Sequence, residues 1–171
     1  MNAETRRQKI LSELKTSSSP ISAGRLASML GVSRQIIVGD VALLRAYGED
    51  ISATPRGYVL SGGREERLVR TVACCHGGED MEKELNIMVD NGCTVKDVIV
   101  EHPIYGQITG NLQLSSRYDV HQFAQLSQEK DAMPLSYLTD GLHLHTLLCP
   151  DEETYERVCA QLRKAGFLLD E

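Results

Sequence analysis

The 171-residue sequence predicts an α+β protein built from two domains. Residues 1–61 contain three runs with helical spacing of apolar residues, followed by two short strand-like runs. Residues 68–164 alternate between strand and helix patterns in the order β-α-β-β-α-β-α. Between these regions, Ser61-Gly62-Gly63-Arg64-Glu65-Glu66 interrupts the apolar pattern with two glycines and a run of charges. We therefore expect one domain over 1–62 and a second over 66–171.

Three helices are expected in the first domain. Apolar residues at helical spacing predict the first helix at 4–16 and the second at 23–30. Gly31 supplies a flexible turn, and Ser33 is a good N-cap for a third helix that runs to about Tyr47.

A hairpin is expected to follow the helices. Strand-like runs at 51–54 and 58–60 flank Pro55-Arg56-Gly57, where proline presets the φ angle of a turn and glycine relieves its exit. Three helices followed by a hairpin predict a winged helix-turn-helix.

The second domain is expected to be an open-faced sandwich. Its predicted strands are 68–75, 95–101, 107–114 and 142–148, and its predicted helices are 79–90, 117–128 and 152–164. This order is typical of helices packed on one face of an antiparallel sheet, which leaves the other face free for a partner or a binding site.

Charge is divided unevenly between the two regions. The whole chain has a net charge of −6, but residues 1–61 carry eight lysines and arginines against five acids. The rest of the chain carries ten against nineteen. We therefore expect the basic first domain to approach phosphate groups and the acidic second domain to avoid them.

The third helix has the chemistry to recognise bases. In a helix-turn-helix the second helix of the pair enters the major groove, which would place Ser33, Arg34 and Gln35 at base edges. Arginine can bond guanine through two hydrogen bonds, and glutamine can do the same with adenine. The residues expected to neutralise phosphates are Arg25, Arg45 and Arg56. The alternative is a three-helix interaction module with solvated arginines.

The sequence has no feature of a membrane or secreted protein. No stretch approaches the roughly 18 apolar residues of a membrane span, and the N-terminal residues lack a signal-peptide pattern. We expect a cytoplasmic protein whose five cysteines are buried thiols rather than a disulfide framework. Contact of Cys74 or Cys75 with a metal remains an open alternative, because they directly precede His76.

Histidines in the second domain suggest a metal site. Alternation along a strand places His143 and His145 on the same face, where they could chelate one ion or simply form hydrogen bonds. His76 ends another predicted strand, and Glu84 lies two turns into the next helix. Three imidazoles and a carboxylate suit zinc, nickel, iron or manganese, with positions left for water or an effector.

A second histidine-containing segment suggests a ligand site. His102 precedes Pro103-Ile104-Tyr105-Gly106, a turn that could hold a small aromatic or carboxylate ligand. His121, within a predicted helix, is expected to be a solvated surface residue.

Several of these segments resemble the three-histidine (3H) domain. They are 100–106, 116–120, 134–136 and 138–146, together with His76. The segment Leu30-Gly31-Val32-Ser33-Arg34-Gln35-Ile36-Ile37-Val38 resembles the helix-turn-helix of biotin repressors. Together they make nearly the whole chain similar to the niacin-responsive repressors of bacterial NAD metabolism, although Gly39 stands where those repressors usually have a larger residue.

The resemblance implies a fold, a cofactor and an effector. The implied fold is an HPr-like sandwich. The implied cofactor is a divalent transition metal, with nickel or zinc as the leading candidates. The implied metal ligands are His76, Glu84, His143 and His145. Nicotinic acid would act as co-repressor on genes of niacin uptake or NAD synthesis, with His102, Tyr105 and Arg117 as effector-binding residues.

Three functional hypotheses follow. The first is a homodimeric repressor that binds palindromic double-stranded operator DNA when nicotinic acid occupies a pocket formed by the metal and the His102 loop together. The second is a repressor that responds to the metal alone. The third is a metal-dependent hydrolase, but the sequence lacks an obvious further general base, and a helix-turn-helix has no evident use in one. We therefore do not expect an enzyme.

Overall fold

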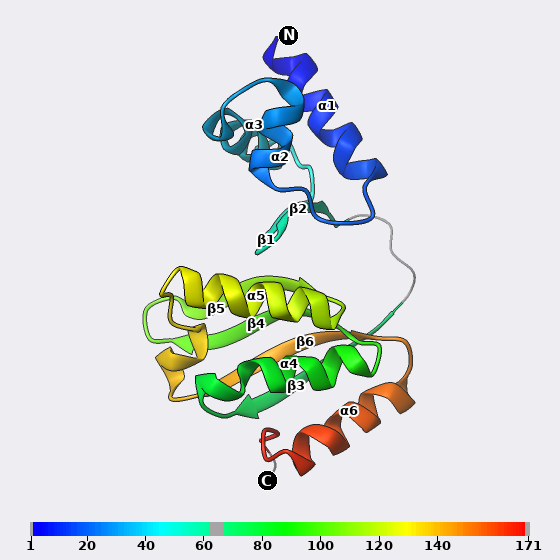
Figure 1. Ribbon diagram of the computed structural model, residues 1–171, viewed down its shortest axis with the longest axis vertical. Coiled ribbons are helices and arrows are strands. Elements are labelled where there is room, and N and C mark those ends of the chain that lie inside the picture. Colours follow the sequence, from blue (N-terminus) through cyan, green and yellow to red (C-terminus); the bar gives the residue numbers. More distant parts are fainter. Residues whose placement is uncertain (1, 62–66, 170–171) are drawn as a thin grey trace. The chain divides into compact units, whose positions relative to one another are not determined.

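The computed structural model describes residues 2–61 and 67–169, which form two compact units (Figure 1). The units comprise Met1–Arg64 and Glu65–Glu171. Each has its own cluster of buried apolar residues. The predicted boundary at Gly62-Gly63 lies outside the described residues.

The first unit contains three helices and a two-stranded hairpin. Its elements are α1 (Ala3–Thr16), α2 (Ala23–Leu30), α3 (Arg34–Ala46), β1 (Ile51–Thr54) and β2 (Gly57–Leu60). The hydroxyl groups of Ser22 and Ser33 cap α2 and α3 by accepting hydrogen bonds from backbone N–H groups. Gly31 ends α2 with a φ of 65°, and the chain bends by 105° between α2 and α3. This geometry is that of a helix-turn-helix.

The hairpin is joined to the helices through the backbone. Ile21, which precedes α2, forms two backbone hydrogen bonds with Tyr58 on β2. Gly57 is required beside this contact, because its φ is 134° and an added Cβ would collide with the backbone of Ile21. Ile10, Leu26 and Ile37 are fully buried where the three helices meet.

The second unit has the predicted order of strands and helices. Its elements are β3 (Leu68–Cys75), α4 (Met81–Asp90), β4 (Thr94–His102), β5 (Gly106–Leu114), α5 (Arg117–Glu129), β6 (Leu142–Cys149) and α6 (Glu152–Lys164). Two short 3₁₀ helices are added, η1 (Gly78–Asp80) and η2 (Leu135–Thr139). The predicted helix at 79–90 therefore begins as a 3₁₀ turn, and η2 was not predicted.

One antiparallel sheet organises the second unit. Its strand order is β3-β6-β4-β5, and all three pairings are antiparallel. The helices α4, α5 and α6 pack over one side of the sheet (Figure 1). Leu85, Met88 and Leu162 are almost fully buried in that layer. The α+β class and the sandwich architecture predicted from the sequence are confirmed.

The helices of both units are short. Within the described residues, no single helix is long and apolar enough to cross a membrane.

Candidate functional site

The predicted metal ligands come from three elements of the second unit. His76 directly follows β3, Glu84 lies in the first turn of α4, and His143 and His145 lie on β6. Alternation along β6 turns both of its histidines toward the helix layer, where α4 presents Glu84. The carboxylate is buried, with a residue exposure of 1%. The tertiary structure therefore brings together four residues that span 70 positions of sequence.

Three imidazoles surround the one carboxylate. Nε2 of His76 lies 2.7 Å from Oε2 of Glu84, and Nε2 of His143 lies 3.0 Å from Oε1. Nε2 of His145 lies 3.4 Å from Oε2. All three rings thus point the same nitrogen at Glu84.

The opposite nitrogen of each ring is held by the backbone. Nδ1 of each histidine lies 2.7 or 2.8 Å from a carbonyl oxygen. The carbonyl groups are those of Gly77 for His76, Gly141 for His143 and Asp97 for His145. Because a carbonyl oxygen only accepts, each Nδ1 carries a hydrogen, and each neutral ring turns the lone pair of Nε2 toward Glu84. Lone pairs facing a carboxylate repel it unless a cation or protons lie between them.

The electrostatics of the cluster agree with this need for positive charge. Burial alone would raise the pKa of Glu84. When the rings carry a proton on Nε2, the charge of His145 and hydrogen bonds from the three imidazoles hold the pKa of Glu84 well below the ordinary value. Burial acts to lower the pKa of His145, yet the Glu84 carboxylate raises it above the ordinary value, and the pKa of His76 is raised in the same way. The carboxylate therefore favours cations at the position shared by the rings.

The donor set fits a divalent transition metal. Two ligand atoms that each lie about 2.1 Å from one ion at a right angle are about 3 Å apart, close to the separations found here. Backbone carbonyl groups that orient ligating histidines through Nδ1 are the usual support of such sites. In addition, Nε2 of His76 and Oε2 of Glu84 are buried without a well-aligned hydrogen-bond partner among the described residues.

Cys74 also belongs to this cluster. It faces His143 in the pairing of β3 with β6 and is fully buried. Ligand atoms of Cys74, Glu84 and His143 all lie within 4.8 Å of one another. Cys75 points to the other face of the sheet and is exposed. The sequence left both thiols open, and only the register between the two strands distinguishes Cys74.

A cavity of about 380 Å³ adjoins the cluster. His76, Gly77, Gly78 and Glu79 line one side, and Ser136, Tyr137, Asp140 and Gly141 line the other. The second group comes from η2 and the turn after it, which the sequence reasoning missed. Gly141 has a φ of 92°, and an added Cβ would collide with the backbone of His76. The available signal in the sequence for this side of the cavity was Gly141, which lies two residues before His143.

The structure does not gather the three predicted effector-binding residues into one pocket. The rings of His102 and Tyr105 lie 5.0 Å apart at the tip of the β4–β5 hairpin. Nδ1 of His102 accepts backbone N–H groups of this turn, which gives the ring a structural role. Arg117 follows the opposite end of the same hairpin, because Val95 pairs with Leu114 there. Arg117 is therefore separated from His102 and Tyr105 within the described chain, and its role in effector binding stays a prediction.

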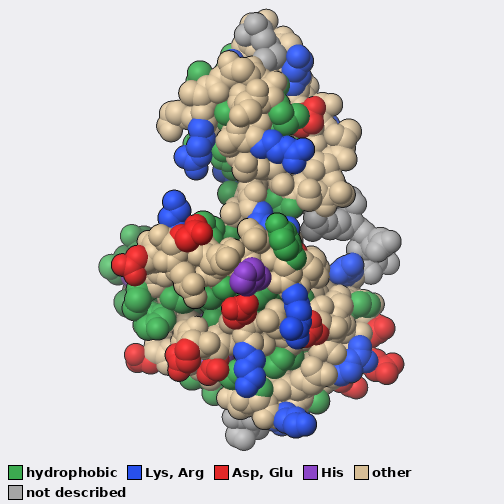
Figure 2. Space-filling model, viewed as in Figure 1, with side chains coloured by type: hydrophobic (Ala, Val, Ile, Leu, Met, Phe, Trp, Pro, Cys, Tyr) green, Lys and Arg blue, Asp and Glu red, His purple; other side chains and the backbone are tan. Residues whose placement is uncertain are grey.

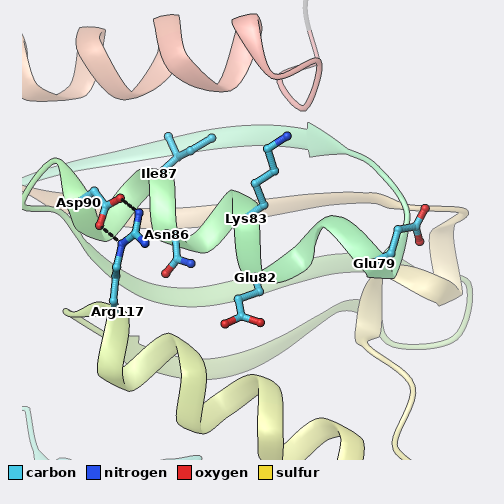
Figure 3. A pocket seen from close by; sticks show the side chains of 7 residues that line it. All are labelled: Glu79, Glu82, Lys83, Asn86, Ile87, Asp90 and Arg117. Atoms are coloured by element: carbon cyan, nitrogen blue, oxygen red, sulfur yellow. Dashed lines mark hydrogen bonds and ion pairs between the residues drawn. The ribbon is translucent and has the colours of Figure 1, made fainter.

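Arg117 instead takes part in an ion pair between helices. Its guanidinium donates two hydrogen bonds, of 2.7 and 2.6 Å, to Asp90 at the end of α4 (Figure 3). The pair borders a cavity of about 450 Å³ that Glu82 and Lys83 also line. His121 is exposed on α5 and lies 3.4 Å from Glu82. It is a surface residue, as expected.

The candidate nucleic-acid interface is the start of α3. Arg34 and Gln35 are exposed in its first turn, and Arg25 is exposed on α2. The hydroxyl of Ser33 accepts the N–H of Ile36, so its oxygen has a capping role. Figure 2 shows basic side chains on the visible surfaces of both units, and most of the visible acidic side chains on the second.

The other two arginines predicted to neutralise phosphates, Arg45 and Arg56, lie at the hairpin. Nε of Arg45 donates to the carbonyl of Ile51 at 2.7 Å, and its guanidinium lies 5.6 Å from the ring centre of Tyr58. This side chain therefore stabilises the helix-hairpin junction, a role the sequence did not indicate. Arg56 is half-buried in the turn between β1 and β2.

Comparison with known proteins agrees with both parts of this description. Residues 69–171 match the 3H domain family, and residues 6–59 match a helix-turn-helix (HTH) domain family. The chain therefore belongs to the class of proteins in which a helix-turn-helix domain precedes a 3H domain.

Two relatives identify the chain more closely. It is 46% identical over 168 residues to the probable transcription repressor NiaR of Thermotoga maritima, covering 98% of this chain and 95% of that protein. It is 44% identical over 167 residues to the transcription repressor NadR of Bacillus subtilis, covering 96% and 93%. The chain belongs to this family of transcription repressors. Both relatives are named as repressors, and neither is named as an enzyme.

Proposed function

We propose that this repressor senses nicotinic acid at a metal centre and then represses genes of niacin uptake or NAD synthesis in the cytoplasm. A divalent transition metal, with nickel or zinc as the leading candidates, would be held by His76, Glu84, His143 and His145. The observation that carries the proposal is the convergence of three backbone-oriented imidazoles on one buried carboxylate. The resemblance to niacin-responsive repressors supports the choice of effector.

The cavity beside His76 supports a ligand of small size. Its volume of about 380 Å³ falls within the range of small-molecule sites. A bound ion supplies a Lewis acid that accepts a pyridine nitrogen or a carboxylate. His76 positions a ligand at the edge of the cluster, and Tyr137 and Ser136 shield it from water on the side of η2. His102 and Tyr105 form a separate candidate contact at the hairpin tip.

Binding of the effector has to change affinity for DNA. We propose that it stabilises a homodimer whose two α3 helices match the halves of a palindromic operator, with Arg34 and Gln35 at bases and Arg25 at phosphates. A coupling free energy of roughly 1–3 kcal/mol between effector and DNA would alter the affinity about 5-fold to 150-fold.

Operator binding by the full-length protein tests the proposal. A duplex selected from a random library would be titrated with metal-free protein, with zinc- or nickel-loaded protein, and with loaded protein plus nicotinic acid or nicotinamide. We expect nicotinic acid to strengthen binding only in the loaded protein, and sedimentation to show a dimer on the DNA. The H143A/H145A variant should lose this response, whereas H121A should keep it.

Two results would contradict the proposal in different ways. Affinity that does not change with nicotinic acid in loaded protein would remove the effector. A full response to metal without an organic ligand would instead identify a repressor that senses the ion itself.

A further inference from the structure

Cys74 is the one sulfur donor within reach of the cluster's ligand atoms among the described residues. Its side chain is fully buried on β3 and lies opposite His143 on β6. The ligand atoms of Cys74, Glu84 and His143 all lie within 4.8 Å of one another. Two bonds to one ion span at most about 4.5 Å, so a small side-chain movement would bring all three atoms to one ion. A zinc–sulfur bond is about 2.3 Å long, and the bonds to nitrogen and oxygen are about 2.0–2.2 Å.

Two polar atoms of the cluster that face each other at 2.7 Å support a cation at this position. Oε2 of Glu84 and Nε2 of His76 are enclosed, and neither has a well-aligned hydrogen-bond partner in the described part of the chain. Leaving such atoms buried without a partner is unfavourable. A cation between the rings and the carboxylate would satisfy both atoms, and Cys74 borders the same space.

We propose that Cys74 is a further ligand of the ion and binds it as a thiolate when the ion is thiophilic, as zinc and cobalt are. This inference rests on the metal site proposed above. On binding, a bond forms between sulfur and the ion, the S–H bond breaks, and its proton leaves to solvent. No electron is transferred.

Charge balance supports a thiolate in this buried position. A divalent ion with three neutral imidazoles and the Glu84 carboxylate alone keeps one net positive charge. The thiolate of Cys74 brings the sum to zero, which lowers the cost of burying the centre. Sulfur ligands also favour zinc and cobalt over manganese, because thiolates are soft donors. Cys74 would therefore set which ions the repressor accepts.

Buried cysteines elsewhere in the unit provide a matched control. Cys93 is as deeply buried as Cys74, at 1% exposure, but its neighbour is the thiol of Cys149 at 2.9 Å. A cysteine that serves only as a small apolar side chain would behave alike at both positions. The two sites differ in their proximity to Glu84 and His143.

Cobalt loading of the full-length protein tests the inference by absorption spectroscopy. A thiolate bound to cobalt gives a strong near-ultraviolet charge-transfer band, which imidazole and carboxylate ligands do not give. We expect the band in the wild type and in C93A. In C74A and C74S the band should be lost. One cobalt ion should still bind, with an affinity roughly tenfold or more below that of the wild type. The preference for zinc over manganese should fall in the same variants.

Each outcome has a definite meaning. Cobalt bound by the wild type without the band, or a band that persists in C74A and C74S, would overturn the role of Cys74 but leave the metal site intact. A wild type that binds no cobalt, zinc or nickel would refute the metal site and this inference together.

Thiol alkylation provides a test that needs no variant, should neither substitution fold. Partly denatured wild-type protein would be treated with iodoacetamide with and without cobalt, and modified cysteines located by mass spectrometry. Cobalt should protect Cys74 and leave the exposed Cys75 reactive. Equal modification of Cys74 in both conditions would contradict the proposal.

Discussion

Gly39 in the middle of α3 has no role that the fold of its own unit explains. It is exposed, and a Cβ added there would meet nothing within 4 Å. Glycine inside a helix costs about 1 kcal/mol relative to alanine. Since no described residue near it requires a glycine, we predict that Gly39 allows α3 to approach DNA closely.

Substituting Gly39 by alanine should therefore separate stability from binding. We expect G39A to raise the free energy of unfolding of the first unit by about 1 kcal/mol and to weaken operator binding. Thermal unfolding and DNA titration measure the two effects. G24A, at another open glycine on α2, is the control and should not weaken binding. Unchanged operator affinity in G39A would show that the glycine is unrelated to DNA.

The exposed arginines of the first unit should differ in what they recognise. Removing Arg34, placed to reach bases, should cost about 1–3 kcal/mol of binding and relax the preference at one operator position. Removing Arg25, placed to reach phosphate, should weaken binding to all DNA sequences alike. It should also reduce the slope of log affinity against log salt concentration by about one. Affinities of R34A and R25A for operator variants at several salt concentrations distinguish these effects. If R34A lost the same affinity for every operator variant, Arg34 would be a phosphate contact.

At the scale of elements, the junction of β3, α4 and β6 determines how stability depends on pH. In metal-free protein, the raised pKa values of His76 and His145 stabilise the fold below their unfolded value of 6.5. This contribution is lost as pH rises through the folded pKa values. The lowered pKa of Glu84 stabilises the fold above 4.5 and is lost as pH falls through the folded value.

Metal-free protein should therefore be most stable between these two limits and lose stability above pH 6.5. Zinc-loaded protein should not lose stability as pH rises, because the ion binds deprotonated Nε2 atoms and therefore binds more tightly at higher pH. Calorimetric unfolding of both forms across this range measures the difference. Parallel pH profiles with and without zinc would contradict the assignment of these rings as ligands. H121A should behave as the wild type.

At the scale of the whole molecule, two separate cores predict two unfolding transitions. Leu26 is fully buried in the first cluster and Met88 in the second. Replacing either by alanine should cost about 2–5 kcal/mol. Scanning calorimetry should show that L26A lowers one transition temperature and M88A the other. A single transition that both variants lower together would indicate that the units unfold as one.

Prediction from sequence succeeded where the signal is local. Serine caps, helical spacing and strand alternation are properties of neighbouring residues, and they placed every long element of the described chain within one or two residues, apart from the 3₁₀ start before α4. The short helix η2 has no such periodicity. It was missed, together with its contribution of Ser136 and Tyr137 to the cavity.

Side-chain partners across long sequence separations were less predictable. The alternation of His143 and His145 made them neighbours, but the pairing of Cys74 with His143 depends on strand register. Arg117 could not be assigned from sequence, because its partner Asp90 ends a different helix. Arg45 likewise bonds a carbonyl group that the hairpin brings to it.

The amino-acid sequence by itself determined the order of elements, the basic and acidic regions, and the four residues that meet at the cluster. Periodicity and residue chemistry are properties of short stretches of sequence. Only the tertiary structure decided that three Nε2 atoms face one buried carboxylate, that the thiol of Cys74 lies near them, and that Arg117 pairs with Asp90. These facts depend on how strands pair and where α4 packs on the sheet, since contact between distant residues is created by folding.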